Sequence, residues 1–115
     1  MTPEEFAILI ARISDNDPTL TEINLFEGEY IKLITTEEAA QLSEALIINT
    51  NVITLIVTSV IFGNNDEASQ SFANALEVNE GMRYLGIDFG KFSLEGKQMI
   101  ENALTINTRI EILPQ

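Results

Sequence analysis

Apolar positions along the chain follow two alternating periods. In four short stretches every second residue is apolar, which is the pattern of a β-strand with one buried face. These stretches begin at Leu20, Val52, Met82 and Ile110. In the segments before and between them, apolar residues recur at i, i+3 and i+4, as in Leu42, Ala45 and Leu46, which is the spacing of one helix face. The pattern therefore predicts alternating helices and strands.

A short motif, Ala-Leu-x-(Ile/Val)-Asn, marks the end of three predicted helices. It occupies residues 45–49, 75–79 and 103–107, and the next strand begins three residues after each Asn. Asp17 stands at the same distance before the first strand, and the four strand starts are 32, 30 and 28 residues apart. The chain thus repeats one helix-strand unit four times. We expect each Asn to end its helix as a C-cap in the left-handed conformation.

The predicted helix starts carry N-cap signals. Thr2 and Glu5 have the spacing of a capping box, so the first helix is predicted over residues 3–14. The other candidate N-caps are Thr35, Asp66 and Ser93.

Repetition of a helix-strand unit predicts the fold class. Two strands joined by one helix must run parallel, and such a crossover is right-handed. Stacked units of this size form a solenoid with strands on its concave face and helices on its convex face. We therefore expect an α/β solenoid of four αβ units, forming a single domain over residues 1–115. An aromatic residue follows the first three strands at a fixed offset, at Tyr30, Phe62 and Phe92, and these rings should stack in the interior.

The repeat period and two segments resemble a known family. The strand pattern, the Ala-Leu-x-x-Asn helix end and the period of 28–32 residues are similar to leucine-rich repeats of the ribonuclease-inhibitor type. Within that class, residues 13–25 (Ile-Ser-Asp-Asn-Asp-Pro-Thr-Leu-Thr-Glu-Ile-Asn-Leu) resemble the entry to the C-terminal repeat domain of tropomodulins and leiomodins. Residues 44–46 and 49–52 are similar to the repeat that follows.

The resemblance implies a fold and a kind of partner. It implies a right-handed leucine-rich-repeat solenoid in which the helix over 3–14 is the N-terminal cap. It also implies a protein-binding role, and in tropomodulins the partner is the pointed end of an actin filament. One family feature is missing, because the Asn that ribonuclease-inhibitor repeats carry three residues after the strand is replaced by Gly28, Val60 and Gly90. Other groups must therefore stabilise the strand-to-helix bends.

Composition narrows the chemistry further. The chain has 115 residues with no Cys and no His, which excludes disulfides, zinc sites built on thiolate or imidazole, and triads with a His base. Its 18 Asp and Glu against 6 Lys and Arg give a net charge of −12, which excludes nucleic acid and favours a basic protein surface as partner. The N-terminus is acidic, unlike a signal peptide, and the most apolar stretch, residues 45–62, is too polar to span a membrane. We expect a cytoplasmic protein that does not contact membranes.

Acidic pairs are the remaining candidates for catalysis or metal binding. Paired carboxylates can hydrolyse glycosides, but Glu4–Glu5 and Glu37–Glu38 lie in first helical turns, where they complement the helix dipole. Residues 15–17, Asp-Asn-Asp, resemble the start of a calcium loop but lack its Gly and its final Glu, which favours a helix-to-strand turn. We therefore expect no enzymatic activity, no cofactor and no metal site.

The outward strand positions form the candidate binding site on the concave face. The predicted protein-binding residues are Glu22, Asn24, Phe26, Thr54, Ile56, Thr58, Tyr84, Asp88 and Ile112. Apolar and aromatic side chains surrounded by polar ones are typical of interface cores, and Tyr84 is the strongest candidate for a hot spot. Small solenoids also leave such residues outward without a partner, which is the alternative interpretation. Gly86 removes a side chain from this surface and would either admit a ligand or only weaken its strand.

These features predict a non-enzymatic protein-protein interaction module that binds a partner through the concave strand face and the adjacent loops. Two alternatives remain: a tropomodulin-like, actin-filament-associated cytoskeletal domain, and an acidic inhibitor of a basic enzyme. Actin follows from the resemblance, and a basic protein follows from the net charge. The last predicted strand leaves one edge uncovered, so pairing of that edge with a second copy would form a homodimer.

Overall fold

The computed structural model describes residues 2–25 and 34–113. Its helices are α1 (Pro3–Ser14), α2 (Thr36–Ile48), α3 (Asp66–Val78) and α4 (Leu94–Ile106). Its strands are β1 (Glu22–Asn24), β2 (Thr54–Val57), β3 (Tyr84–Ile87) and β4 (Glu111–Ile112), and a 3-10 turn, η1, covers Ser59–Ile61. The first helix begins and ends where the sequence predicts.

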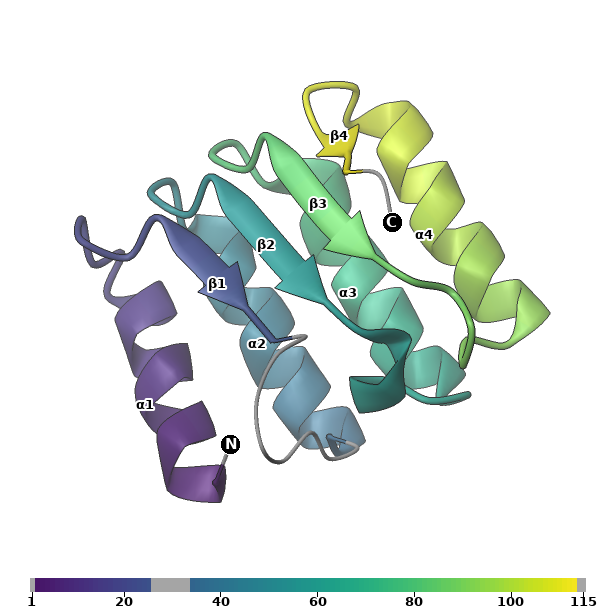
Figure 1. Cartoon of the computed structure of the whole chain (residues 1–115), viewed down its shortest axis with the longest axis horizontal. Helices are drawn as coiled ribbons and strands as arrows, with labels where there is room; N and C mark the ends of the chain where they lie inside the picture. Colours follow the sequence, from purple (N-terminus) through teal and green to yellow (C-terminus); the bar gives the residue numbers. More distant parts are fainter. Residues whose placement is uncertain (1, 26–33, 114–115) are drawn as a thin grey trace.

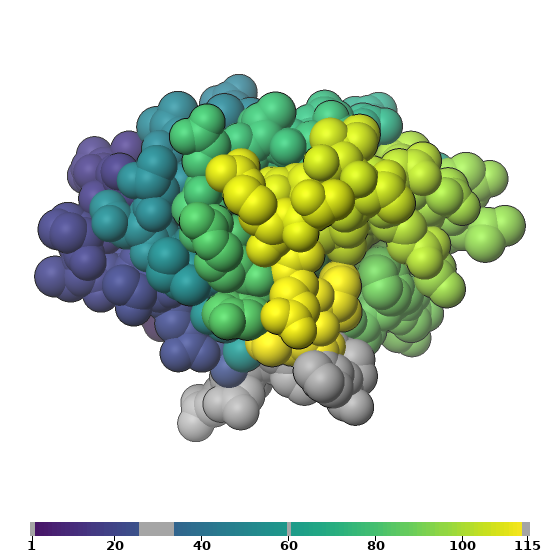
Figure 2. Space-filling model, turned by 90° about the horizontal axis from the view of Figure 1, so that it is seen from above, coloured from purple at the N-terminus to yellow at the C-terminus, as the bar shows by residue number. Residues whose placement is uncertain are grey.

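The four strands form one parallel sheet in the order β1-β2-β3-β4. The helices lie in a layer behind the sheet, and no described helix covers its other face (Figure 1). The repeats stack in chain order from the N-terminal to the C-terminal end of the molecule (Figure 2). The predicted α/β fold, a short leucine-rich-repeat solenoid, is therefore confirmed.

The core fills the space between the sheet and the helix layer. Ile23, Leu55 and Leu85 pair across the sheet in register, and all three side chains are buried. The residues at helical spacing cover this row from behind, as Phe72 and Leu76 do from α3. Burial of one such Leu side chain contributes about 1.5–3 kcal/mol. No unit could bury its apolar face alone, which is why the repeats stack.

Two of the three predicted aromatic rings stack at the strand-to-helix bends. The Phe62 ring is fully buried, and its centroid lies 5.7 Å from that of Phe92 and 4.8 Å from that of Phe72. Tyr30 lies outside the described residues. The predicted aromatic ladder is therefore confirmed for the second and third repeats.

The helix starts follow the sequence with one exception. The predicted N-caps at Thr2, Thr35 and Ser93 are confirmed. The prediction of Asp66 as the N-cap of α3 is wrong, because that role belongs to Asn65. Its Oδ1 accepts hydrogen bonds from the N–H groups of Glu67 and Ala68, at 3.1 and 3.2 Å. Asp66 is the first helical residue, where its charge complements the helix dipole.

The motif Asn residues do not adopt the predicted left-handed conformation. Asn49 and Asn79 have φ of −78° and −62° with ψ of 134° and 131°, which is extended backbone. Asn107 has φ of −96° and ψ of 86°. All three side chains are buried, and each donates its amide to the preceding repeat. The prediction that each Asn is the C-cap of its helix is confirmed, and only the left-handed conformation is wrong. The buried side chains bridge neighbouring repeats.

The Asn79 side chain makes four hydrogen bonds, two of them to the preceding repeat and two within its own turn. Its Nδ2 donates to the carbonyl groups of Leu46, at 2.6 Å, and Asn49, at 3.2 Å. Its Oδ1 accepts from the N–H groups of residues 81–82, at 3.0 and 2.6 Å. Asn107 makes the equivalent donations one repeat later. The position requires both donors and an acceptor, and a side-chain amide supplies both.

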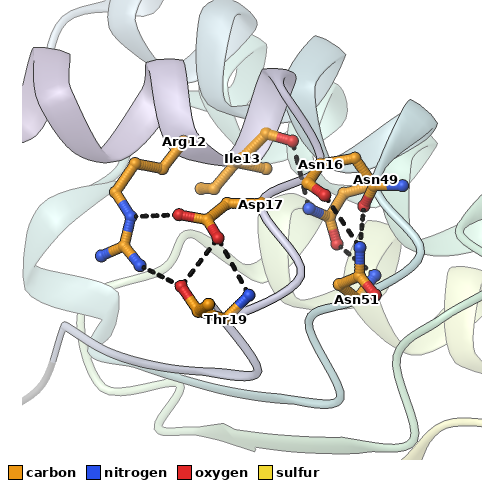
Figure 3. Close-up of polar contacts among 7 residues, drawn as sticks. All are labelled: Arg12, Ile13, Asn16, Asp17, Thr19, Asn49 and Asn51. Carbon is orange, nitrogen blue, oxygen red and sulfur yellow. Dashed lines mark hydrogen bonds and ion pairs between the residues drawn. The ribbon is translucent and has the colours of Figure 1, made fainter.

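In the first repeat Asp17 takes the place of the motif Asn (Figure 3). Thr19 donates its hydroxyl and its N–H to Oδ1, at 2.7 and 2.9 Å, and Arg12 Nε donates to Oδ2 at 2.9 Å. These bonds, led by that from the Thr19 hydroxyl, lower the pKa of Asp17 to about 2. All of these bonds are accepted by the Asp17 side chain, so a carboxylate can fill the position that an amide fills in the later repeats. Residues 15–17 form the predicted helix-to-strand turn.

Candidate protein-binding face

Two cross-strand rows of residues project from the side of the sheet opposite the helices. Paired residues of neighbouring parallel strands project from the same face, so the register defines each row. The first row is Glu22, Thr54, Tyr84 and Glu111. The second row is Asn24, Ile56 and Gly86. We call the surface formed by these two rows the open face; its strands lie in front of the helices in Figure 1.

The open face combines a large aromatic side chain with polar neighbours. Tyr84 leaves 40% of its surface exposed, although it sits on an inner strand of the sheet. Glu22, Asn24 and Glu111 are exposed, and Thr54 and Ile56 are half-buried. An aromatic residue inside a polar rim is the composition expected of a protein interface core.

Gly86 does not open a hollow in this face. A Cβ atom at Gly86 would lie 3.3 Å from Cγ1 and 3.4 Å from Cγ2 of Ile56, so the Ile56 side chain already occupies the space above it. Gly86 itself is buried. The interpretation of Gly86 as an opening for a ligand is therefore wrong. The absence of a side chain at Gly86 instead allows Ile56 on β2 to pack against the backbone of β3.

Thr58 and Asp88, also predicted to face a partner, form hydrogen bonds at the strand-to-helix bends. Thr58 is only 6% exposed, so the expectation of an outward side chain is wrong. Asp88 accepts hydrogen bonds from the N–H and the hydroxyl of Ser59, at 3.0 and 2.7 Å, and from the N–H of Gly90, at 3.3 Å. Burial alone would raise the pKa of Asp88, but the hydrogen bonds from Ser59, Thr58 and Gly90 outweigh it and lower that pKa.

These bonds explain how the bends manage without the Asn of ribonuclease-inhibitor repeats. The Asp88 carboxylate ties the bend after β3 to the bend after β2, and the N–H of Lys91 donates to Ser59 Oγ at 2.9 Å. Phe26 lies outside the described residues, so its predicted place on the face is not described.

The expected position of Ile112 on the concave face is wrong. The register pairs it with Leu85, whose side chain is buried, and pairs Glu111 with Tyr84. The physical reason is a shorter turn: Glu111 is four residues beyond Asn107, whereas Tyr84 is five beyond Asn79. Ile112 therefore extends the inward row and is 41% exposed at the end of the sheet. Sequence reasoning missed Glu111 because apolar alternation alone does not reveal a link shortened by one residue.

A second exposed apolar surface lies at the C-terminal ends of the helices. Ile48, Val78 and Ile106 precede the motif Asn in their repeats, and they are 60%, 51% and 62% exposed. The Ile or Val that recurs before each motif Asn could have indicated this exposed surface from the sequence. Helical spacing alone does not show that these side chains are exposed. We call these three residues the helix-end ridge. It provides a comparison surface for any test of the open face.

Comparison with known proteins supports the fold from an independent direction. No family model and no curated protein matches the chain. Among solved structures, the actin-binding site 2 of leiomodin-1 is similar with a TM-score of 0.78 and 27% sequence identity, over 97% of this chain and 62% of that chain. The chain has the fold of the leiomodin and tropomodulin C-terminal domain.

A tropomodulin structure shows the same fold at lower identity. The C-terminal domain of tropomodulin from Caenorhabditis elegans is similar with a TM-score of 0.70 and 14% identity, over 94% of this chain and 62% of that chain. This tropomodulin-like chain thus spans less than two thirds of either structure. The resemblance found in residues 13–25 and in the repeat period is confirmed. Across the described part of the chain, no helix is both long and apolar enough to cross a membrane.

Proposed function

We propose that this chain is a non-enzymatic actin-binding module and that the open face contacts actin. The observation that carries the proposal is the similarity, over 97% of the chain, to a leiomodin domain that is itself described as an actin-binding site. The identity of 27% extends the likeness from the backbone to part of the side chains. The tropomodulin structure supports the fold and not the partner, because its identity is only 14%.

The open face is the part of the surface best suited to such contact. Tyr84 provides a large, rigid ring with few rotatable bonds, and Ile56 provides apolar area beside it, since it covers Gly86 on the strand of Tyr84. Aromatic residues of this kind account for much of the binding energy at protein interfaces. The exposed carboxylates and amide around them form the polar rim that orients a partner.

Four carboxylates outside the open face have structural partners. Glu5 and Glu38 complete capping boxes, Asp17 binds Arg12 and Thr19, and Asp88 binds Ser59. These four carboxylates therefore stabilise local structure, which supports a scaffold role for them rather than a catalytic one.

Co-sedimentation with actin filaments, together with titration of monomeric actin, tests the proposal. The chain should bind one or both forms, and Tyr84→Ala should weaken binding by about tenfold or more, as expected for a hot spot. Leu94→Ala is the matched control, because Leu94 is 81% exposed on α4, on the helix side. Circular dichroism should show that both variants remain folded.

Two results would overturn the proposal in different ways. If the unaltered chain binds neither actin form, actin is not the partner. If Tyr84→Ala leaves binding intact while Ser substitutions in the helix-end ridge abolish it, the partner is right and the face is wrong. A pyrene-actin assay of elongation and depolymerisation at the pointed end then determines whether binding affects filament dynamics.

The second candidate function, inhibition of a basic enzyme, is favoured only by the net charge of −12. Binding of that kind is steered by long-range charge, so its association rate should fall steeply with added salt. Inhibition of a basic enzyme that is lost with added salt but is unchanged by Tyr84→Ala would favour this second function over actin binding.

A further inference from the structure

The first row of the open face places an aromatic ring beside a carboxylate. Tyr84 on β3 pairs with Glu111 on β4, and both side chains are exposed. Paired residues of neighbouring strands are about 5 Å apart, so one group can contact both side chains at once. Thr54 and Glu22 continue the row on β2 and β1, so a second carboxylate lies at its far end.

Among residues 2–25 and 34–113, no salt bridge to Glu22 or Glu111 is found. The row itself contains no basic residue. Arg83, next to Tyr84 in sequence, turns its Nη1 back onto the carbonyl groups of residues 80–82, at 3.1 and 3.2 Å. Arg12 forms the one salt bridge found among residues 2–25 and 34–113, and its partner is Asp17. The charges of Glu22 and Glu111 are therefore available to a partner.

We infer that the Tyr84–Glu111 pair is the seat for an arginine or lysine side chain of the protein partner. A cation above a tyrosine ring is attracted by the negative face of the ring, and a carboxylate beside the ring adds a charge-assisted hydrogen bond. Arginine satisfies both, because its planar guanidinium stacks on the ring while its edge donates to the carboxylate. By charge complementarity, the segment of the partner that contacts this row is therefore basic. Glu22, which lies beyond Thr54 in the row, adds a second negative charge for that segment.

Other occupants fit this row less well. A phosphate-rich ligand such as nucleic acid would meet two carboxylates. A metal ion would need more acidic or imidazole ligands, and within the described residues no group of three such side chains is placed to hold one. The partner chemistry that remains is a basic protein segment.

The first test uses actin as the probe and so rests on the proposed function. Glu111→Gln should weaken binding about tenfold, because it removes the charge and keeps the shape. Glu101→Gln, on the exposed surface of α4, makes the same charge change and should alter affinity by less than about twofold. Tyr84→Phe keeps the ring and should behave like the unaltered chain, whereas Tyr84→Ala should not. Equal losses for Glu111→Gln and Glu101→Gln would overturn the inference, because only net charge would then matter.

The second test does not involve actin. N-acetylargininamide is titrated into the isotopically labelled chain, and the ring resonances of Tyr84 are followed by NMR. They should shift saturably in the unaltered chain and at least about fivefold less in Glu111→Gln, while the neutral citrulline analogue should cause no such shift. A shift caused equally by citrulline, or one unchanged by Glu111→Gln, would overturn the inference. If actin fails to bind while this titration succeeds, the proposed function falls and the basic-side-chain seat stands.

Discussion

The side-chain amide of Asn79 donates a hydrogen bond of 2.6 Å to the carbonyl of Leu46, which belongs to the preceding helix. Leu46 lies in the last turn of α2, where backbone carbonyl groups have no partner within the helix. Asn107 satisfies the carbonyl of Leu76 at the end of α3 in the same way. Each helix end is thus completed by the next repeat, which couples the folding of neighbouring units.

This coupling predicts that Asn79→Asp destabilises the protein strongly. The substitution keeps the shape but removes two donors from a side chain that is 1% exposed, and it places a carboxylate against the carbonyl groups of Leu46 and Asn49. We expect the free energy of unfolding to fall by about 3 kcal/mol, as measured by urea denaturation. Asn74→Asp, an exposed substitution in the same helix, should change it by less than about 0.5 kcal/mol. Equal effects of the two variants would contradict the role of the buried amide.

Gly81 is required by a close approach between two turns. A Cβ atom there would lie 2.5 Å from the carbonyl oxygen and 2.8 Å from the Cα of Thr50, both backbone atoms that cannot move aside cheaply. Gly81→Ala should therefore lower the free energy of unfolding by about 2 kcal/mol or more. Gly90→Ala is the control, because its Cβ would meet nothing closer than Asp88 Oδ2 at 3.5 Å. Thermal unfolding of both variants measures the difference, and a stable Gly81→Ala protein would show that the turns are not in contact.

The lowered pKa of Asp17 predicts a loss of stability in acid. Its pKa is 3.8 in the absence of such partners and about 2 in the folded chain, so the unfolded chain takes up the proton first as the pH falls. The stabilisation is complete above about pH 4 and is lost as the pH falls toward 2. The difference in urea midpoint between the unaltered chain and Asp17→Asn should therefore be constant near neutral pH and shrink below pH 4.

Asp88 should contribute in the same direction, since its pKa is also lowered. The difference in urea midpoint between the unaltered chain and Asp88→Asn should therefore shrink in acid. The difference for the double variant, Asp17→Asn with Asp88→Asn, should shrink by more than that for either single variant. A difference that grows as the pH falls would contradict this assignment for both carboxyl groups.

The outer edge of β4 is predicted to pair with a second copy of the chain. The N–H groups of Glu111 and Leu113 donate to the carbonyl groups of Arg83 and Leu85, so the N–H of Ile112 points away from β3. Ile112→Pro removes only that outward donor and should convert a dimer into a monomer. Ile112→Ala retains it and should preserve pairing. Sedimentation equilibrium measures the mass, and a monomeric unaltered chain at every concentration would refute the prediction.

The architecture could be predicted from local patterns because each repeat specifies itself. Strand alternation, helical spacing and the Thr2 and Thr35 caps depend on neighbours within a few residues, and all four units agree. The similarity of residues 13–25 to tropomodulins and leiomodins indicated the same fold from the sequence alone. Because all four units have the same helix-strand pattern, the sequence predicted a stack of repeats that share one core.

The composition of the open face depended on contacts between repeats. Ile56 covers Gly86 because the two are register partners, and Asp88 is engaged because Ser59 lies one repeat away. A link shorter by one residue exchanged Ile112 for Glu111 beside Tyr84, since side chains alternate with a period of two. Periodicity within the sequence therefore determined which elements form and in what order. Tertiary packing alone determined which side chains remain available to a partner, because that depends on how strands of different repeats align.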